Sequence, residues 1–221
     1  VETFCGECFY CKRGFVNNCA DPLGGWALGC RIDGGQADFV RVPHADQGLT
    51  RIPETVTDEQ ALFVGDILAT GYWAAQLAEI KQGDTVAVLG AGPAGLCAMM
   101  CAGLYGASHV VAVDPLAERL ALAKAQGWAD ETADPTRDDV DDLIRRLTNG
   151  RGADAVIEAA GAADTFQTAW RIARPNAVVV VAAMYETAQR LPLPEMYGKN
   201  LTFKTGGVDA NASARILRLI E

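Results

Sequence analysis

Positively charged residues are scarce in this sequence. Lys and Arg number 19 against 28 Asp and Glu, which gives a formal net charge of −9 at pH 7. An acidic surface repels a phosphate backbone, so nucleic acid is not an expected partner. Histidine is scarcer still, with only His44 and His109. His44 lies in a Pro-His-Ala-Asp turn and His109 opens an apolar run, so we interpret both as structural residues rather than metal ligands.

A secretory signal is also not evident at the start of the chain, where acidic Glu2 directly follows Val1. The seven cysteines do not have the pattern of a disulfide framework, because four of them crowd into residues 5–19. Cys97 and Cys101 lie four residues apart in an apolar stretch, where free cysteine packs as a small hydrophobic residue. This usage indicates a reducing, cytoplasmic compartment and a metal cluster.

One stretch resembles a membrane span, because residues 86–113 contain no Asp, Glu, Lys or Arg. However, Gly90, Gly92, Pro93 and Gly95 interrupt this run. A buried strand, a turn and a helix explain such spacing better than a helix that faces lipid. We therefore expect no membrane association.

Beyond residue 80, β-branched runs alternate with helical patterns. Strands are predicted at 85–89, 110–113, 155–158, 177–182 and 201–204. Helices are predicted at 94–105, 115–126, 138–147 and 164–172, and a further helical segment at 58–79, capped by Thr57 or Asp58 and broken near Gly65 or Gly71. Alternation of this kind predicts an α/β fold of the Rossmann type, a doubly wound parallel sheet with helices on both faces. Residues 1–60 instead predict loops and short strands.

A glycine-rich turn connects the first of these strands to the first of these helices. Gly90, Gly92 and Gly95 form the G-x-G-x-x-G fingerprint, with Pro93 and Ala94 opening the helix. The first glycine permits a tight turn, the second lets a pyrophosphate approach the backbone, and the third lets the helix pack on the strand. The phosphates of a dinucleotide would then lie at the helix N-terminus. Proteins that bind FAD or S-adenosylmethionine use similar turns and remain an alternative.

An acidic residue follows at the distance that a nicotinamide cofactor requires. Asp114 ends the second predicted strand, 24 residues after Gly90. A carboxylate at this position accepts hydrogen bonds from the adenosine ribose hydroxyls and repels a 2′-phosphate, which favours NAD over NADP. Arg119 lies about one helical turn further on, where it either reaches the edge of the adenosine or is simply solvated.

Cys5, Cys8, Cys11 and Cys19 form a C-x2-C-x2-C-x7-C loop. Four thiolates on one short loop can enclose a tetrahedral zinc ion, and a site without an open coordination position is structural rather than catalytic. The alternatives are two disulfides or four reduced thiols. Since the loop has little apolar content, metal binding would supply much of its ordering free energy.

The cysteine loop followed by the glycine turn is the order of motifs found in one family. The chain resembles the zinc-containing medium-chain alcohol dehydrogenases. The matching segments are 5–19, 33–40, 66–72, the glycine turn and 152–158. Residues 25–26 and 42–46 most resemble the bacterial subgroup that acts on secondary alcohols or small aldehydes. The resemblance implies a mainly-β GroES-like catalytic domain, present in part at 1–66, and an NAD-binding Rossmann domain at 67–221 whose last residues begin the return to the catalytic domain.

The resemblance also implies roles for further residues. Asp66 falls on the position of a catalytic zinc ligand, although an acidic residue at a helix start is an alternative interpretation. Thr70 and Ala94 are expected against the nicotinamide, and residues near Ala160 and Val181 are expected to line the cofactor cleft.

The family's other catalytic zinc ligands and its proton relay precede the cysteine loop, so we interpret the chain as an internal fragment of a longer enzyme. The predicted activity is hydride transfer between a primary or secondary alcohol, or a small aldehyde, and NAD. Zinc is the second predicted cofactor, and a homo-oligomer is the predicted assembly. The alternatives are a zinc-free relative of the quinone reductases and a non-catalytic NAD-binding or structural protein.

Overall fold

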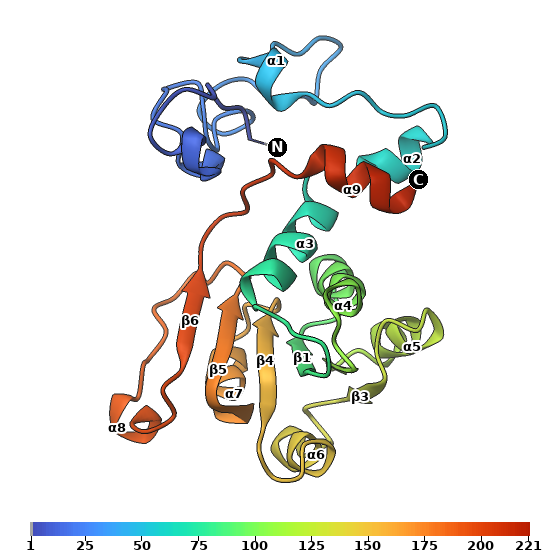
Figure 1. The fold of residues 1–221 in the computed structure, drawn as a ribbon, viewed down its shortest axis with the longest axis vertical. Helices are drawn as coiled ribbons and strands as arrows, with labels where there is room; N and C mark the ends of the chain where they lie inside the picture. The colour runs from blue at the N-terminus through green and yellow to red at the C-terminus, as the bar shows by residue number, and fades with distance from the viewer. Residues whose placement is uncertain (1) are drawn as a thin grey trace. The chain divides into compact units, whose positions relative to one another are not determined.

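A computed structural model describes residues 2–221 of the chain (Figure 1). The chain divides into two compact units. Unit 1 comprises the residues up to Ala69 together with Gly207–Glu221, and unit 2 comprises Thr70–Gly206. Each unit is described by itself below.

Unit 2 is built on a six-stranded sheet in which every pairing is parallel. The strand order is β3-β2-β1-β4-β5-β6. The strands are β1 (Thr85–Leu89), β2 (His109–Val113), β3 (Glu131–Ala133), β4 (Ala153–Glu158), β5 (Ala173–Val181) and β6 (Thr202–Thr205). This order places β1 at the centre and confirms the predicted Rossmann-type α/β fold.

Helices connect the strands, as the alternating pattern predicts. They are α4 (Pro93–Tyr105), α5 (Ala117–Ala125), α6 (Val140–Leu147), α7 (Thr165–Ile172) and the short α8 (Leu193–Met196). The division between the units falls inside α3 (Ile67–Leu77). In Figure 1, the strands β1, β4, β5 and β6 run side by side through the middle of unit 2.

The centre of the sheet forms because strands such as β1 are buried on both faces. All five residues of β1 are buried, and the core cluster includes Leu89, Val111, Val156 and Val179, each at most 1% exposed. At about 25 cal/mol per Å² of apolar surface, such residues supply most of the free energy that opposes chain entropy. A strand buried on both faces is typical of a parallel sheet covered by helices.

The one strand of unit 2 that was not predicted is β3. Its three residues, Glu131, Thr132 and Ala133, have no apolar alternation, and they pair with Val111, Ala112 and Val113 of β2. A strand this short is formed by its partner rather than by its own pattern.

Unit 1 is irregular by comparison. It contains α1 (Ala45–Gly48), α2 (Asp58–Leu62), α9 (Ser213–Ile220) and the 3-10 turns η1 (Cys11–Arg13) and η2 (Val16–Asn18). The predicted break near Gly65 is confirmed, since α2 ends before it and α3 begins after it. Thr57 caps α2 through a capping box with Gln60.

The prediction of short strands in residues 1–60 is wrong for the described part of the chain. Only two isolated bridges occur there, Thr3 with Gly25 and Leu28 with Ile32. The alternating segment around Phe39 and Val40 forms no strand, and Phe39 is 91% exposed. An alternating pattern forms a strand only where a neighbouring strand completes its hydrogen bonds, and none of the described residues supplies one here.

No helix within residues 2–221 is both long enough and apolar enough to cross a membrane. The uncharged run that resembled a membrane span instead forms β1, the glycine turn, α4 and β2.

Candidate functional site

The glycine turn follows β1 at the carboxyl end of the sheet. Gly90 has φ +98°, a conformation that side chains disfavour, and its N–H donates to the Val113 carbonyl at 2.7 Å. A Cβ atom on Gly90 would lie 3.0 Å from Ala159 and Ala160. The tight turn therefore requires glycine at this position, as the sequence predicted.

The other two glycines of the motif have different surroundings. A Cβ atom on Gly95 would lie 1.9 Å from the Gly90 carbonyl oxygen, so α4 can pack against the turn only if this residue is glycine. A Cβ atom on Gly92 would meet no protein atom closer than the Arg119 Nη1 at 3.8 Å. Space beside the backbone at Gly92 is what an approaching phosphate requires.

The N-terminus of α4 offers hydrogen-bond donors. Gly92 occupies the cap position, Pro93 opens the helix and Ala94 lies in its first turn. Within the described residues, no side chain caps this helix end. The first N–H groups of a helix lack partners in the helix itself, and together with the helix dipole they favour a negatively charged group.

Asp114 comes directly after β2 and is 3% exposed. Its Oδ2 accepts a hydrogen bond from the Ala91 N–H at 2.8 Å, and its Oδ1 accepts one from the Leu116 N–H at 2.8 Å. The Arg119 Nη1 lies 3.5 Å from the same Oδ2, and the Arg119 side chain is 45% exposed. The Oδ1 atom, which accepts only the Leu116 N–H, still has a lone pair for a further donor such as a ribose hydroxyl.

The remaining cleft residues of unit 2 lie at the same edge of the sheet. Val181 is the last residue of β5, and Ala160 follows β4. The structure thus brings the glycine turn, Asp114, Ala160 and Val181 to the carboxyl ends of neighbouring strands, where open α/β sheets bind ligands.

Sequence analysis did not single out Glu158 as a site residue. It ends β4 with 0% exposure, and its Oε1 accepts hydrogen bonds from the N–H groups of Ala160 at 2.9 Å and Gly161 at 2.8 Å. The signal that could have found it was a carboxyl residue at the end of an apolar strand, the same feature that drew attention to Asp114.

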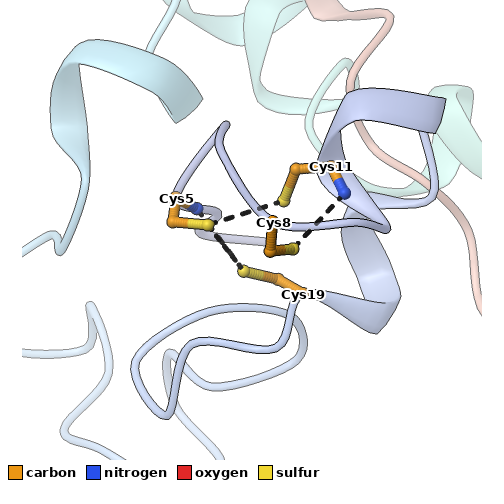
Figure 2. A group of neighbouring side chains, drawn as sticks. All are labelled: Cys5, Cys8, Cys11 and Cys19. Atoms are coloured by element: carbon orange, nitrogen blue, oxygen red, sulfur yellow. Dashed lines mark hydrogen bonds between the residues drawn. The ribbon is translucent and has the colours of Figure 1, made fainter.

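Unit 1 holds the cysteine loop. The sulfur atoms of Cys5, Cys8, Cys11 and Cys19 all lie within 4.8 Å of one another (Figure 2). Cys5 Sγ is 3.6 Å from Cys19 Sγ and 4.0 Å from Cys11 Sγ. Four sulfurs at about 2.3 Å from a zinc ion would be about 3.8 Å apart, so these residues fit a tetrahedral zinc.

Backbone donors surround the sulfurs. The N–H groups of Cys11 and Ala20 each donate to Cys8 Sγ at 3.5 Å, and the N–H of Cys5 donates to Cys19 Sγ at 3.4 Å. The donors from Ala20 and Cys11 lower the pKa of Cys8 to about 6, whereas burial raises the pKa of Cys11 to about 12. A bound cation reverses the second effect, because a coordinating thiol is deprotonated. All four cysteines are free of disulfide bonds.

Across residues 2–221, the four cysteines are the only group of potential ligands with metal-binding spacing. Asp66, which directly precedes α3, belongs to no such group, and Thr70 lies in the first half of α3. The described residues therefore do not by themselves form a second zinc site.

A central glycine turn with an acidic residue after the second strand is typical of dinucleotide-binding proteins, and the four cysteine sulfurs fit a zinc ion. A family model described as zinc-binding dehydrogenase matches residues 93–218. The chain belongs to this family, the zinc-containing medium-chain alcohol dehydrogenases, which confirms the resemblance.

Individual relatives agree with this assignment. Zinc-type alcohol dehydrogenase B of Aspergillus flavus is 36% identical over 211 residues, which cover 92% of this chain and 49% of the relative. The NADP-dependent isopropanol dehydrogenase of Thermoanaerobacter brockii is 34% identical over 213 residues, 95% of this chain and 60% of the relative. A solved structure of zinc-dependent alcohol dehydrogenase 2 from Streptococcus pneumonia superposes with a TM-score of 0.90 at 34% identity, covering 99% of this chain and 62% of that one. The chain thus spans about half to three-fifths of the length of its relatives.

Proposed function

We propose that the chain is part of a zinc-dependent alcohol dehydrogenase that transfers hydride between an alcohol and NAD. The observation that carries this proposal is the pairing of the glycine turn with Asp114 at the carboxyl edge of the sheet. It supports a nicotinamide dinucleotide whose pyrophosphate lies at the start of α4. The family membership supports the oxidoreductase chemistry.

The preference for NAD over NADP rests on the charge at Asp114. A carboxylate beside the adenosine ribose repels a 2′-phosphate. Arg119 at 3.5 Å offsets part of that charge, and the isopropanol dehydrogenase relative is described as NADP-dependent. NAD is nevertheless the proposed cofactor, because the Asp114 side chain is almost fully buried whereas that of Arg119 is 45% exposed.

Zinc has two proposed places. The cysteine loop would hold a structural ion, and Asp66 would contribute one ligand to a catalytic ion whose other ligands are not among the described residues. When bound, a catalytic zinc would act as a Lewis acid on the substrate oxygen while NAD accepts the hydride. Thr70, Ala94, Ala160 and Val181 are proposed to position the nicotinamide.

The proposed substrate is a primary or secondary alcohol, or a small aldehyde in the reverse direction. We also propose a homo-oligomer, paired through the exposed edge of β6. A groove of about 670 Å³ beside this strand supports the pairing, and it is lined by apolar residues that include Leu193, Met196, Tyr197 and Phe203. The proposed domains are a partial GroES-like catalytic domain at 1–66 and the NAD-binding domain at 67–221, within an enzyme longer than this chain.

The test compares alcohol-dependent reduction of NAD with NAD affinity, measured side by side on the zinc-loaded full-length enzyme and its Asp66→Ala variant. We expect the variant to lose turnover and to retain NAD affinity, because Asp66 is proposed to hold metal and not cofactor. Unchanged turnover would remove Asp66 from the catalytic site. Absence of binding by either nicotinamide cofactor would refute the proposed function as a whole.

A further inference from the structure

Glu158 connects two segments at the edge of the sheet through its carboxyl group and its main-chain oxygen. Its Oε1 accepts the N–H groups of Ala160 and Gly161, which form the turn after β4. Its main-chain oxygen accepts the N–H groups of Ala182 at 2.8 Å and Ala183 at 3.2 Å, which follow β5. One residue therefore holds the turn after β4 and the end of β5 in a fixed relation.

The turn after β4 also contacts the glycine turn. The Ala159 N–H donates to the Leu89 carbonyl at 2.8 Å, and a Cβ atom on Gly90 would lie 3.0 Å from atoms of Ala159 and Ala160. A displacement of Ala160 would consequently change the crevice between β1 and β4. This crevice is the point at which the strand order reverses, where a dinucleotide crosses the sheet.

Gly161 leaves the turn little freedom to rearrange. Its φ is +65°, and a Cβ atom there would lie 2.8 Å from the Met184 carbonyl oxygen. The turn is thus confined on one side by the segment after β5 and on the other side by the Glu158 carboxyl group.

The second carboxyl oxygen of Glu158 is buried, and the Tyr185 hydroxyl is the described group close enough to interact with this carboxyl group. Tyr185 lies nearby and shares a hydrogen bond with Thr165 Oγ1 at 2.9 Å. Burial, with a further contribution from the Glu158 carboxyl group, raises the pKa of Tyr185 to about 12. A buried carboxyl group is costly to desolvate, and the N–H groups of Ala160 and Gly161 offset that cost by binding its Oε1, which holds the turn at this edge.

We propose that Glu158 is a positioning residue for the nicotinamide half of the cofactor, acting through the Ala160–Gly161 turn. The proposal rests on the proposed function. Asp114 follows β2 and Glu158 ends β4, the two strands that flank β1, and each fixes backbone N–H groups on its side of the cofactor crevice. Asp114 is proposed to position the adenosine half of the cofactor. Glu158 therefore positions the nicotinamide half, which lies on the other side of β1.

The test uses the affinities of the full-length enzyme for NADH and for AMP, which occupies only the adenosine half. Glu158→Met retains the side-chain volume and removes both acceptor oxygens. We expect it to weaken NADH binding by about tenfold, the effect of about one net hydrogen bond to a positioned backbone, and to leave AMP binding within about twofold. Glu158→Gln retains an oxygen for the two N–H groups and should bind NADH within about threefold of the unaltered enzyme.

Asp154→Asn is the matched control, because Asp154 lies near the opposite end of the same strand, where it accepts the Thr85 N–H at 2.8 Å and pairs with Arg174. It should leave the ratio of NADH to AMP affinity unchanged. Gly161→Ala disturbs the same turn without altering Glu158, and it should reproduce the selective loss of NADH affinity even if Glu158→Met does not fold.

Equal losses of NADH and AMP affinity in Glu158→Met and Gly161→Ala, or no loss in either, would overturn the proposal. So would a Glu158→Gln variant as weak as Glu158→Met. An unaltered enzyme that binds neither ligand overturns the proposed function itself, which is a distinct result.

Discussion

The Ala91 N–H donates a hydrogen bond of 2.8 Å to Asp114 Oδ2, so the backbone of the glycine turn is held by the carboxylate that follows β2. The two residues are 23 positions apart and lie on adjacent parallel strand ends. Asp114 therefore has a structural task in addition to the ribose recognition that we propose for it. Variants at this position must separate the two tasks.

We predict that Asp114→Asn weakens NAD binding by about tenfold while NADP binding is unchanged or stronger. The amide retains one oxygen acceptor for the backbone, but it loses the charge that repels a 2′-phosphate. Isothermal calorimetry with both cofactors measures the effect. Asp130→Asn is the control, because Asp130 accepts the Val110 N–H at 2.8 Å near the amino end of the same strand, remote from the glycine turn. An unchanged ratio of NAD to NADP affinity in Asp114→Asn would contradict the assigned role.

Two glycines of α4 should respond oppositely to a methyl group. Gly95→Ala places a Cβ atom 1.9 Å from the Gly90 carbonyl oxygen, and we expect about 3 kcal/mol of destabilisation together with loss of NAD binding. Gly103 is exposed in the same helix, and a Cβ atom there would meet nothing within 4 Å. Gly103→Ala should therefore stabilise the protein by about 0.5–1 kcal/mol. Urea unfolding of both variants provides the comparison, and similar effects at the two positions would refute the packing explanation.

Removal of zinc should loosen the cysteine loop. We expect the purified protein to contain about one structural zinc per chain, and Cys8→Ser to lower that content because a thiolate ligand is lost. Chelation of the parent protein should make Cys5, Cys8, Cys11 and Cys19 reactive toward a thiol reagent. Cys30 is exposed and belongs to no metal-binding group among the described residues, so Cys30→Ser should leave the zinc content unchanged. Mass spectrometry under native conditions measures the zinc content of both variants. A Cys8→Ser protein that retains full zinc would contradict the assignment of Cys8 as a zinc ligand.

The stability of unit 1 should depend on pH through Asp209. Burial raises the pKa of Asp209, while the Asn17 N–H, which donates to its Oδ1 at 2.9 Å, opposes this effect. Between the unfolded value of about 3.9 and the raised folded value, the folded state binds more protons. The free energy of unfolding therefore falls as the pH rises through that interval, and the cost persists above it.

Asp209→Asn retains the oxygen acceptor and removes the charge. The variant should therefore lose the dependence of the unfolding free energy on pH, and it should be more stable than the parent protein at neutral pH. Denaturant unfolding at about pH 4 and about pH 7 measures the difference. Asp38→Asn, which removes an exposed carboxylate of the same unit, is the control for a change in net charge. A slope that survives in Asp209→Asn would assign it to other groups.

Much of unit 2 was predictable because its signals are local. The Val-rich segments that became β1, β2, β4 and β5 are apolar over whole strands, and no partner has to be known for them to be recognised. The requirement for glycine at positions 90 and 95 likewise follows from the tight turn that the motif encodes. The spacing of the four cysteines predicted that they converge, and their sulfur atoms do lie within 4.8 Å of one another.

What depended on distant pairing was not predictable. The strand β3 exists because β2 offers it hydrogen bonds, and the segment around Phe39 is not a strand because no described residue pairs with it. The hydrogen bond from Asn17 to Asp209 joins residues 192 positions apart, which no local pattern encodes.

The sequence by itself determined the alternation of apolar strands with helices, the glycine turn and the convergence of the four cysteines, because side-chain type and short spacing are sufficient for each. Only the tertiary structure decided that the Asp114 carboxylate holds the glycine turn and that Glu158 connects the ends of β4 and β5. The physical reason is that a buried carboxyl group takes its partners from whichever backbone N–H groups the folded sheet brings within reach, and that choice is made by the packing of the whole unit.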